Sequence, residues 1–184
     1  MYTLVQERPS DAPTIERLYE AAFGPGRYTR AAERLRETNR KVDDLCFIAE
    51  EDGALAGSVR FWPVMAGQGQ TMTPGLMLGP LAVQPHRRRN GMGVALIQAG
   101  LARATEAGVP FVFLVGDEPY YSRAGFQLAA VGRFEMPGPV DAHRLLVREL
   151  CGGGAEAAGK IIPAPAFADL AAFAPPAAQK RAAN

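Results

Sequence analysis

The chain has 184 residues, of which 48% are hydrophobic and 21% charged, so it fits one globular domain and is neither a charged disordered chain nor a membrane protein. Twenty lysines and arginines against nineteen aspartates and glutamates leave a formal net charge of +1, which argues against a dedicated nucleic-acid binder. Because neither a basic and apolar leader nor a run of about 18 apolar residues is found, the expected location is the cytoplasm.

The amino-terminal part predicts a strand followed by two helices. Residues 2–6 form a short strand, and Pro13, placed after two capping candidates, starts a helix with apolar residues at helical spacing. Gly24-Pro25-Gly26 ends that pattern. Residues 29–38 carry few apolar side chains among charges and predict a second, more exposed helix.

Strands dominate the middle of the chain. Residues 45–50 and 55–64 predict an antiparallel pair, because the acidic turn between them contains Gly53, which tolerates positive φ. Residues 67–75 are rich in Gly, Gln, Thr and Pro and predict a loop before an apolar strand at 77–83. The proline in Gly79-Pro80 cannot donate to a ladder, so this strand is expected at a sheet edge or at a bulge.

The second half predicts a crossover and then shorter elements. Residues 93–107 predict a helix, and residues 111–115 form an apolar run typical of a strand buried on both faces. A strand, a helix and a strand in this order predict a right-handed crossover between parallel neighbours. After them we expect a short helix at 119–123, strands at 127–130, 145–150 and 160–163, and an Ala- and Pro-rich tail at 168–184.

The segment between the strand at 77–83 and the helix at 93–107 carries the chemistry. It contains Arg88-Arg89-Asn90-Gly91-Met92-Gly93. Glycines let a ligand approach the backbone, unpaired amides at a helix start point outward, and arginines bind phosphate oxygens bidentately. These features suit a pyrophosphate, and a solvated basic loop explains them equally well.

Residues 88–93 match the [QR]-x-x-G-x-[GA] acyl-CoA motif, and the chain thereby resembles the GNAT superfamily of N-acetyltransferases. Residues 79–83 resemble its bulged fourth strand, and residues 120–126 resemble its tyrosine-containing helix ending in Gly-Phe, most like the YhbS-like branch. The resemblance implies an α/β (α+β mixed) fold, with a mostly antiparallel sheet, splayed central strands and flanking helices. It divides the chain into a GNAT acetyltransferase domain at 1–167 and the tail at 168–184.

The resemblance also assigns cofactor-binding roles. The pyrophosphate of acetyl-CoA is expected on one contiguous segment and the pantetheine chain on backbone groups of the strand before it. The pyrophosphate residues are Arg88, Arg89, Asn90, Gly91, Met92 and Gly93, and the pantetheine residues are Leu81 and Val83.

Tyr121 is the expected catalytic residue. It lies four residues before Gly125, where the family places the general acid that protonates the leaving thiolate, whereas packing of the helix suits its neighbour Tyr120 better. The general base stays open between Asp117, Glu118 and water, because residues 77–83 contain no carboxylate.

The expected function is an acetyl-CoA-dependent N-acetyltransferase in which a primary amine attacks the thioester directly, without a metal. The alternative is a non-catalytic module that binds or senses acyl-CoA, which the missing carboxylate on the fourth strand favours. The amine is a small molecule or a peptide of unknown identity, and a homodimer is left open. Neither a nucleic acid nor a membrane is an expected partner.

Overall fold

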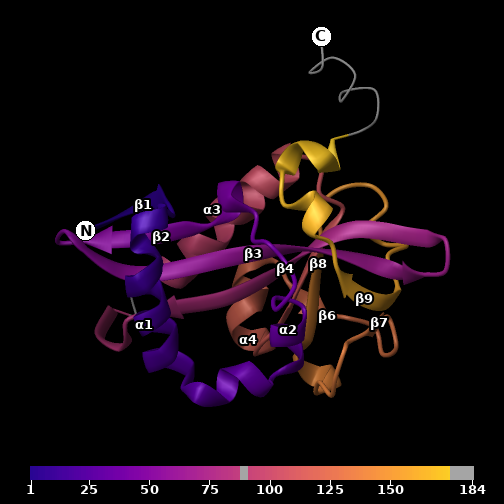
Figure 1. Cartoon of the computed structure of the whole chain (residues 1–184), viewed down its shortest axis with the longest axis horizontal. Coiled ribbons are helices and arrows are strands. Elements are labelled where there is room, and N and C mark those ends of the chain that lie inside the picture. The colour runs from indigo at the N-terminus through magenta and orange to yellow at the C-terminus, as the bar shows by residue number, and fades with distance from the viewer. Residues whose placement is uncertain (88–90, 175–184) are drawn as a thin grey trace, which may run out of the picture.

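The computed structural model describes residues 1–87 and 91–174, and within them nine strands form a single mixed sheet (Figure 1). Its main order is β1-β2-β3-β4-β5-β8-β6, with β9 beside β3 and β7 beside β9. Two pairs, β4–β5 and β7–β9, are parallel and the other pairs are antiparallel, which confirms the expected mostly antiparallel mixed sheet. The strands are β1 Tyr2–Gln6, β2 Phe47–Glu51, β3 Ala54–Gln68, β4 Thr71–Val83, β5 Phe111–Val115, β6 Gln127–Leu128, β7 Phe134–Glu135, β8 Leu145–Glu149 and β9 Gly159–Pro163.

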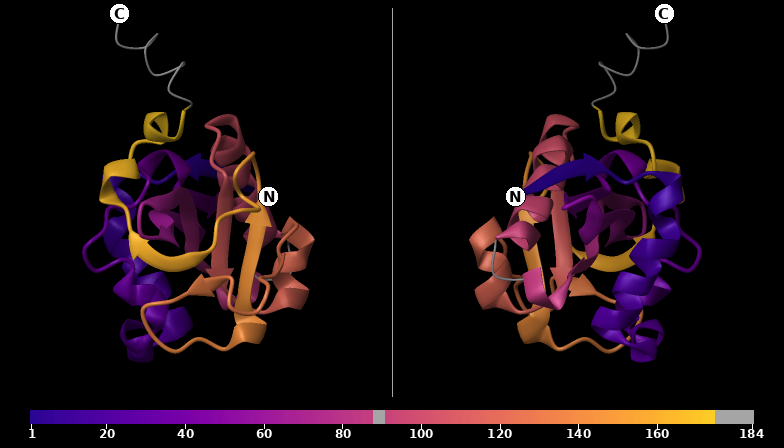
Figure 2. Two further views of the ribbon diagram at one scale, coloured as in Figure 1. Left: turned by 90° about the vertical axis from the view of Figure 1, so that its right-hand side faces the viewer. Right: turned by 90° about the vertical axis from the view of Figure 1, so that its left-hand side faces the viewer.

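Helices cover both faces of this sheet. The edge-on views show α1 and α2 on one face and α3 and α4 on the other (Figure 2). Neighbouring residues of β3 show the same division, because Ser58 bonds to Tyr19 of α1 whereas Gly57 lies against Leu96 of α3. The helices are α1 Ala12–Phe23, α2 Ala31–Arg34, α3 Met92–Glu106 and α4 Glu118–Tyr121. No helix in the described part of the chain is both long and apolar enough to cross a membrane.

The prediction of a loop at residues 67–75 is wrong, because β3 and β4 continue through this segment as one long hairpin. Only the turn at Gly69, where φ is +61°, interrupts the two strands. The other two glycines of this segment, Gly67 and Gly75, allow close packing and do not form turns. A Cβ on Gly67 would lie 2.1 Å from the carbonyl oxygen of Thr71, and one on Gly75 would lie 2.4 Å from the ring of Phe111.

The second helix is shorter than residues 29–38, since α2 is α-helical only over Ala31–Arg34. Its end is fixed by Asn39, whose side-chain amide donates to the carbonyl oxygens of Leu35 at 3.0 Å and of Pro63 on β3 at 2.7 Å. These bonds satisfy a carbonyl that a longer helix would have used and tie the segment to the sheet. The segment after α1, residues 24–39, therefore forms an arch over the sheet rather than a second long helix.

The predicted crossover is confirmed, with β4 and β5 parallel and joined through α3. Pairing between these strands consists of Leu76 opposite Val112 and Met77 opposite Phe113, whereas β4 continues to Val83. The two strands therefore separate beyond Met77. Part of the expected tail packs on the domain, because Phe173 is buried in the apolar cluster beneath α3.

Candidate active site

A bulge in β4 opens the sheet at its centre. Val59 of β3 faces Leu81, and Phe61 faces Leu78, so two steps along β3 correspond to three along β4. The extra residue falls at Gly79-Pro80, which confirms the bulge that the proline predicted. A sheet edge is excluded, because β4 pairs with β3 on one side and with β5 on the other.

Side chains from two other elements hold the bulge in place. The indole Nε1 of Trp62 donates to the carbonyl oxygen of Gly79 at 2.7 Å. The hydroxyl of Tyr19 donates to the carbonyl oxygen of Pro80 at 3.1 Å and lies 2.8 Å from the hydroxyl of Ser58. Carbonyl groups that would otherwise lack ladder partners are thereby satisfied. The sequence pattern gave no sign that these residues would support the bulge.

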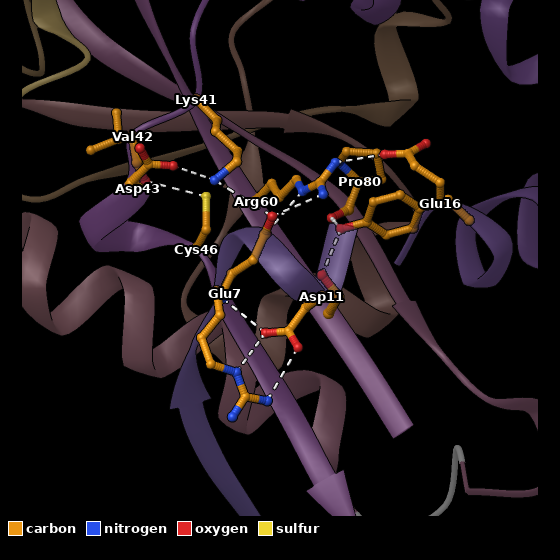
Figure 3. A network of polar contacts seen from close by, with 12 residues as sticks. Glu7, Asp11, Glu16, Lys41, Val42, Asp43, Cys46, Arg60 and Pro80 are labelled. Carbon is orange, nitrogen blue, oxygen red and sulfur yellow. Dashed lines mark hydrogen bonds and ion pairs between the residues drawn. The ribbon is translucent and has the colours of Figure 1, made fainter. Parts of the chain in front are cut away.

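A partly buried ion-pair network lies behind Tyr19. The guanidinium of Arg60 on β3 lies between the carboxylates of Glu7 and Glu16, with two 2.9 Å contacts to Glu7 and one of 2.7 Å to Glu16 (Figure 3). The Glu7 side chain is only 2% exposed, and Lys41 adds a second cation 3.5 Å from it. Burial raises the pKa of Tyr19, so its hydroxyl stays protonated and able to donate. The network fixes α1, and with it Tyr19, against the sheet.

A cavity of about 320 Å³ adjoins the bulge. Its walls come from residues 77–81 of β4, from Val115 at the end of β5, from the arch after α1, from Tyr121 and from the segment at 139–144. It therefore lies where β4 and β5 separate, on the sheet face covered by α1 and α2. A cavity of this size suits a small ligand or one end of a larger one.

Tyr121 reaches this cavity from α4. Gly116 makes room for it, because a Cβ there would lie 2.2 Å from the Tyr121 ring. Burial, with smaller contributions from Tyr120 and Asp117, raises the pKa of Tyr121, so the phenol keeps its proton at physiological pH. The hydroxyl has no hydrogen-bond partner among the described residues and is free to donate to a ligand.

Tyr120 points to a different place from its neighbour. The two rings pack edge to face with centroids 5.0 Å apart. A Cβ on Gly93 would lie 2.0 Å from the Tyr120 hydroxyl, so this ring packs on the first turn of α3. Position 93 therefore requires glycine, because a side chain there would collide with Tyr120. The packing reading of Tyr120 fits this contact, and Tyr121 is the tyrosine at the cavity.

The start of α3 supplies the other candidate binding feature. Gly91 caps the helix with φ +70° and no atom within 4 Å of a Cβ placed there, so its glycine is needed for conformation and leaves open space. The Met92 side chain is fully buried, which leaves only its backbone for a ligand. Arg88, Arg89 and Asn90 lie outside the described residues.

The two pantetheine candidates on β4 differ in position. Leu81 is half-buried and lines the cavity next to the bulge, whereas the side chain of Val83 is buried in the main apolar cluster. Any contact of Val83 with a ligand would therefore run through its backbone, as the resemblance implied.

Neither acidic candidate for the base lines the cavity. Asp117 is 76% exposed and pairs with Arg144 at 3.1 Å, and Glu118 is exposed at the start of α4. The carboxylate in the cavity wall is Asp141, which accepts a hydrogen bond from the backbone amide of His143 at 2.9 Å. Sequence reasoning missed Asp141 because it lies in an irregular segment far from any motif.

Cys46 and His86, two other residues with reactive side chains, do not line this cavity. Burial raises the pKa of the Cys46 thiol to about 12, which makes it inert, and His86 is exposed. Across residues 1–87 and 91–174, no group of three or more His, Cys, Asp or Glu side chains is arranged to hold a metal ion.

Residues 12–126 match the Acetyltransferase (GNAT) family. The chain belongs to this family, as the motif at 88–93, the bulged strand and the helix ending in Gly-Phe predicted. It is 34% identical over 144 residues to the uncharacterized N-acetyltransferase YhbS of Escherichia coli K12, a match covering 76% of this chain and 84% of YhbS. A second relative, the uncharacterized N-acetyltransferase YjhQ of the same organism, is 29% identical over 71% of this chain and 73% of YjhQ.

Solved structures give the same result. The crystal structure of Escherichia coli YhbS in complex with CoA has a TM-score of 0.73 and 28% identity, covering 90% of this chain and 91% of that chain. A GNAT family acetyltransferase from Brucella melitensis in complex with acetyl-CoA has a TM-score of 0.56 and 32% identity, over 80% and 96% of the two chains. The predicted fold and the YhbS-like branch are confirmed.

Proposed function

We propose that the protein transfers the acetyl group of acetyl-CoA to a primary amine held in the cavity beside the β4 bulge. The observation that carries this proposal is the position of Tyr121, a protonated phenol whose hydroxyl bonds to none of the described residues, on the wall of a cavity at the β4–β5 opening. Membership of an acetyltransferase family, and the CoA and acetyl-CoA bound by the relatives described above, support it.

The start of α3 fits a pyrophosphate. Open space surrounds Gly91, the first amides of a 15-residue helix lack intrahelical partners, and the helix dipole adds partial positive charge there. Arg88, Arg89 and Asn90 directly precede this turn in the sequence and are proposed to complete the site. Backbone groups of Leu81 and Val83 are proposed to hold the pantetheine chain.

The reaction needs one proton donor and one proton acceptor. Bound acetyl-CoA supplies the acetyl group: the amine nitrogen bonds to the thioester carbon, the C–S bond breaks, and its electron pair leaves on sulfur. Tyr121 gives its proton to that sulfur and recovers one from water. The amine proton leaves to water in contact with the cavity or to Asp141.

The experiment measures release of free thiol when the protein is mixed with acetyl-CoA and a panel of primary amines. The proposal predicts amine-dependent thiol release and acetylated product in equal amounts. CoA alone at about one hundred times its dissociation constant should stabilise the fold by roughly 2.7 kcal/mol. Stabilisation without turnover on any amine would favour the non-catalytic acyl-CoA-binding module, and no stabilisation would contradict both readings.

A further inference from the structure

Positive charge gathers on the cavity wall. Among the described residues, four arginines line it, Arg27, Arg30, Arg36 and Arg144, against one carboxylate, Asp141. The wall therefore carries three more cationic than anionic side chains, although the whole chain has a formal net charge of only +1. Such an excess of positive charge, beside the gap between β4 and β5, favours the binding of an anion.

Two of these arginines carry unused hydrogen-bond donors. In the described part of the chain, the buried side-chain polar atoms without a partner are the Nε atoms of Arg27 and Arg36. Buried donors are nearly always paired in folded proteins, and an unpaired one costs stability. Both arginines belong to the wall of one cavity, so their guanidinium groups are not saturated by acceptors among the described residues.

The carboxylates that pair with Arg27 and Arg36 do not line the cavity. Arg27 contacts Glu16 at 2.7 Å and Arg36 contacts Glu33 at 2.8 Å, and neither glutamate lines the cavity. These pairs orient the guanidinium groups and leave some of their five N–H donors unused. Arg30 has no carboxylate partner among the described residues and rests on the ring of Phe23.

We propose that the acceptor is a small amine that also carries an anionic group, a carboxylate or a phosphate, and that this group binds to Arg36 with Arg27 and Arg30 around it. The inference rests on the proposed acetyl transfer and names the class of amine that this site takes. Guanidinium groups suit such anions because their fork of donors matches two oxygens at once.

Arg36 has the best position for this role. Its Nη2 atom lies 3.3 Å from the point where a Cβ on Gly79 would stand, so the guanidinium sits directly beside the bulge. Burial lowers the pKa of Arg36 although Glu33 pairs with it, so a further anion would favour its charged form. In an α-amino acid a single carbon separates the amine from the carboxyl carbon, so an anchored carboxylate holds the amine close to the opening.

The test measures binding and turnover separately. Calorimetry on the protein, with and without saturating CoA, would compare N-acetylalanine, its phosphonate analogue and its carboxamide, and repeat the set with N-acetylphenylalanine. Thiol release from acetyl-CoA would be followed in parallel with alanine, phenylalanine, their carboxamides and their phosphonates. We expect the anionic forms to bind about 10- to 100-fold more tightly than the carboxamides, as hydrogen bonds to charged groups typically allow. The more tightly bound anion identifies the group.

Variants test whether the arginines recognise the negative charge of the ligand. Arg36→Gln should abolish most of the preference for the anion, and Arg30→Gln, at an exposed position where folding is not at risk, should reduce it. Arg40→Gln is the matched control, because Arg40 is exposed and does not line the cavity. Circular dichroism and thermal melting would verify that each variant folds.

Each outcome separates this inference from the proposed function. Turnover that favours carboxamides, or no binding preference for either anion, overturns the anionic acceptor and leaves acetyl transfer standing. Preferential binding of anions without thiol release confirms the anion site and contradicts the transferase. An equal loss of turnover on charged and uncharged amines in Arg36→Gln would assign Arg36 to the thioester oxygen and overturn the inference.

Discussion

The two sides of the central opening are built in different ways. On the proposed cofactor side, one contiguous stretch from a strand into α3 contains the glycine turn, the helix amides and the adjacent arginines. On the acceptor side, the cavity is assembled from the arch after α1, the β4 bulge, the end of β5, Tyr121 and the segment before β8. A ligand shared by a whole family can be bound by one short sequence motif. An acceptor particular to one protein is bound by residues scattered along the chain.

The contacts that support the two sides also differ. The proposed acceptor side rests on the ion-pair network of Glu7, Arg60 and Glu16 and on bonds from Tyr19 and Trp62 to the bulge. The cofactor side rests on apolar packing of α3 and on the contact of Tyr120 with Gly93. Breaking each support in turn should affect a different property of the protein.

The largest effect is expected from Arg60→Met. This change leaves the carboxylate of Glu7 buried, with Lys41 as its one remaining cation among the described residues, and removing one partner of a buried pair typically costs about 3–5 kcal/mol. Denaturant titration would measure the loss. The matched control is Arg8→Met, which breaks the ion pairs of an exposed arginine with Asp11 and Glu50 and should cost much less. Equal losses would show that the cluster has no special structural role.

Next comes Tyr121→Phe, which deletes the proton donor and keeps the ring. General acid catalysis contributes about 10² to 10⁴ in rate, and a thiol leaves fairly well without help, so we expect turnover to fall about 100-fold. Acetyl-CoA affinity should be nearly unchanged. Steady-state kinetics beside Tyr120→Phe decides the matter, since a greater loss of turnover in the Tyr120 variant would make Tyr120 the donor.

Gly93→Ala tests the support on the cofactor side. The new Cβ would stand 2.0 Å from the Tyr120 hydroxyl, and overpacking of this kind typically costs about 1–3 kcal/mol. Removing that oxygen with Tyr120→Phe should restore at least half of the loss in the double variant. Thermal melting of the four proteins measures the coupling, and additive losses would mean that the contact does not matter.

The smallest expected effect is on the alkaline side of the pH profile. Burial raises the pKa of Tyr121 above its ordinary value of about 10, so the acid form persists to higher pH. Turnover should therefore rise as the acceptor amine loses its proton and should not fall again below about pH 10. A fall in this range that is present in the wild type and absent in Tyr121→Phe would show that Tyr121 titrates below pH 10 and would contradict the raised pKa.

Much of the fold could be predicted from the sequence because its signals are local. Helical spacing located α1 and α3, and the proline in β4 located the bulge. The hairpin at residues 67–75 was missed because Gly67 and Gly75 resemble loop residues, although close approach to Thr71 and Phe111 is what requires them. Such a requirement depends on tertiary neighbours and leaves no local pattern.

The site divides in the same way. Tyr121 could be found because it precedes Gly-Phe at a fixed spacing, and the cavity lies where the splayed strands were expected. Arg36 and Asp141 could not, because one lies in a charged segment that resembles a solvated surface and the other in an irregular connection. Only the fold brings them to the same cavity.

The central claim is that acetyl transfer takes place at the β4–β5 opening beside Tyr121. A crystal structure with CoA tests it most directly, because the position of the sulfur can be measured. Our account predicts the CoA sulfur in the opening next to Gly79-Pro80, within hydrogen-bond distance of the Tyr121 hydroxyl, with the arginine-lined cavity free for the acceptor. A sulfur lying outside the opening, or the CoA chain filling the arginine-lined cavity itself, would contradict it.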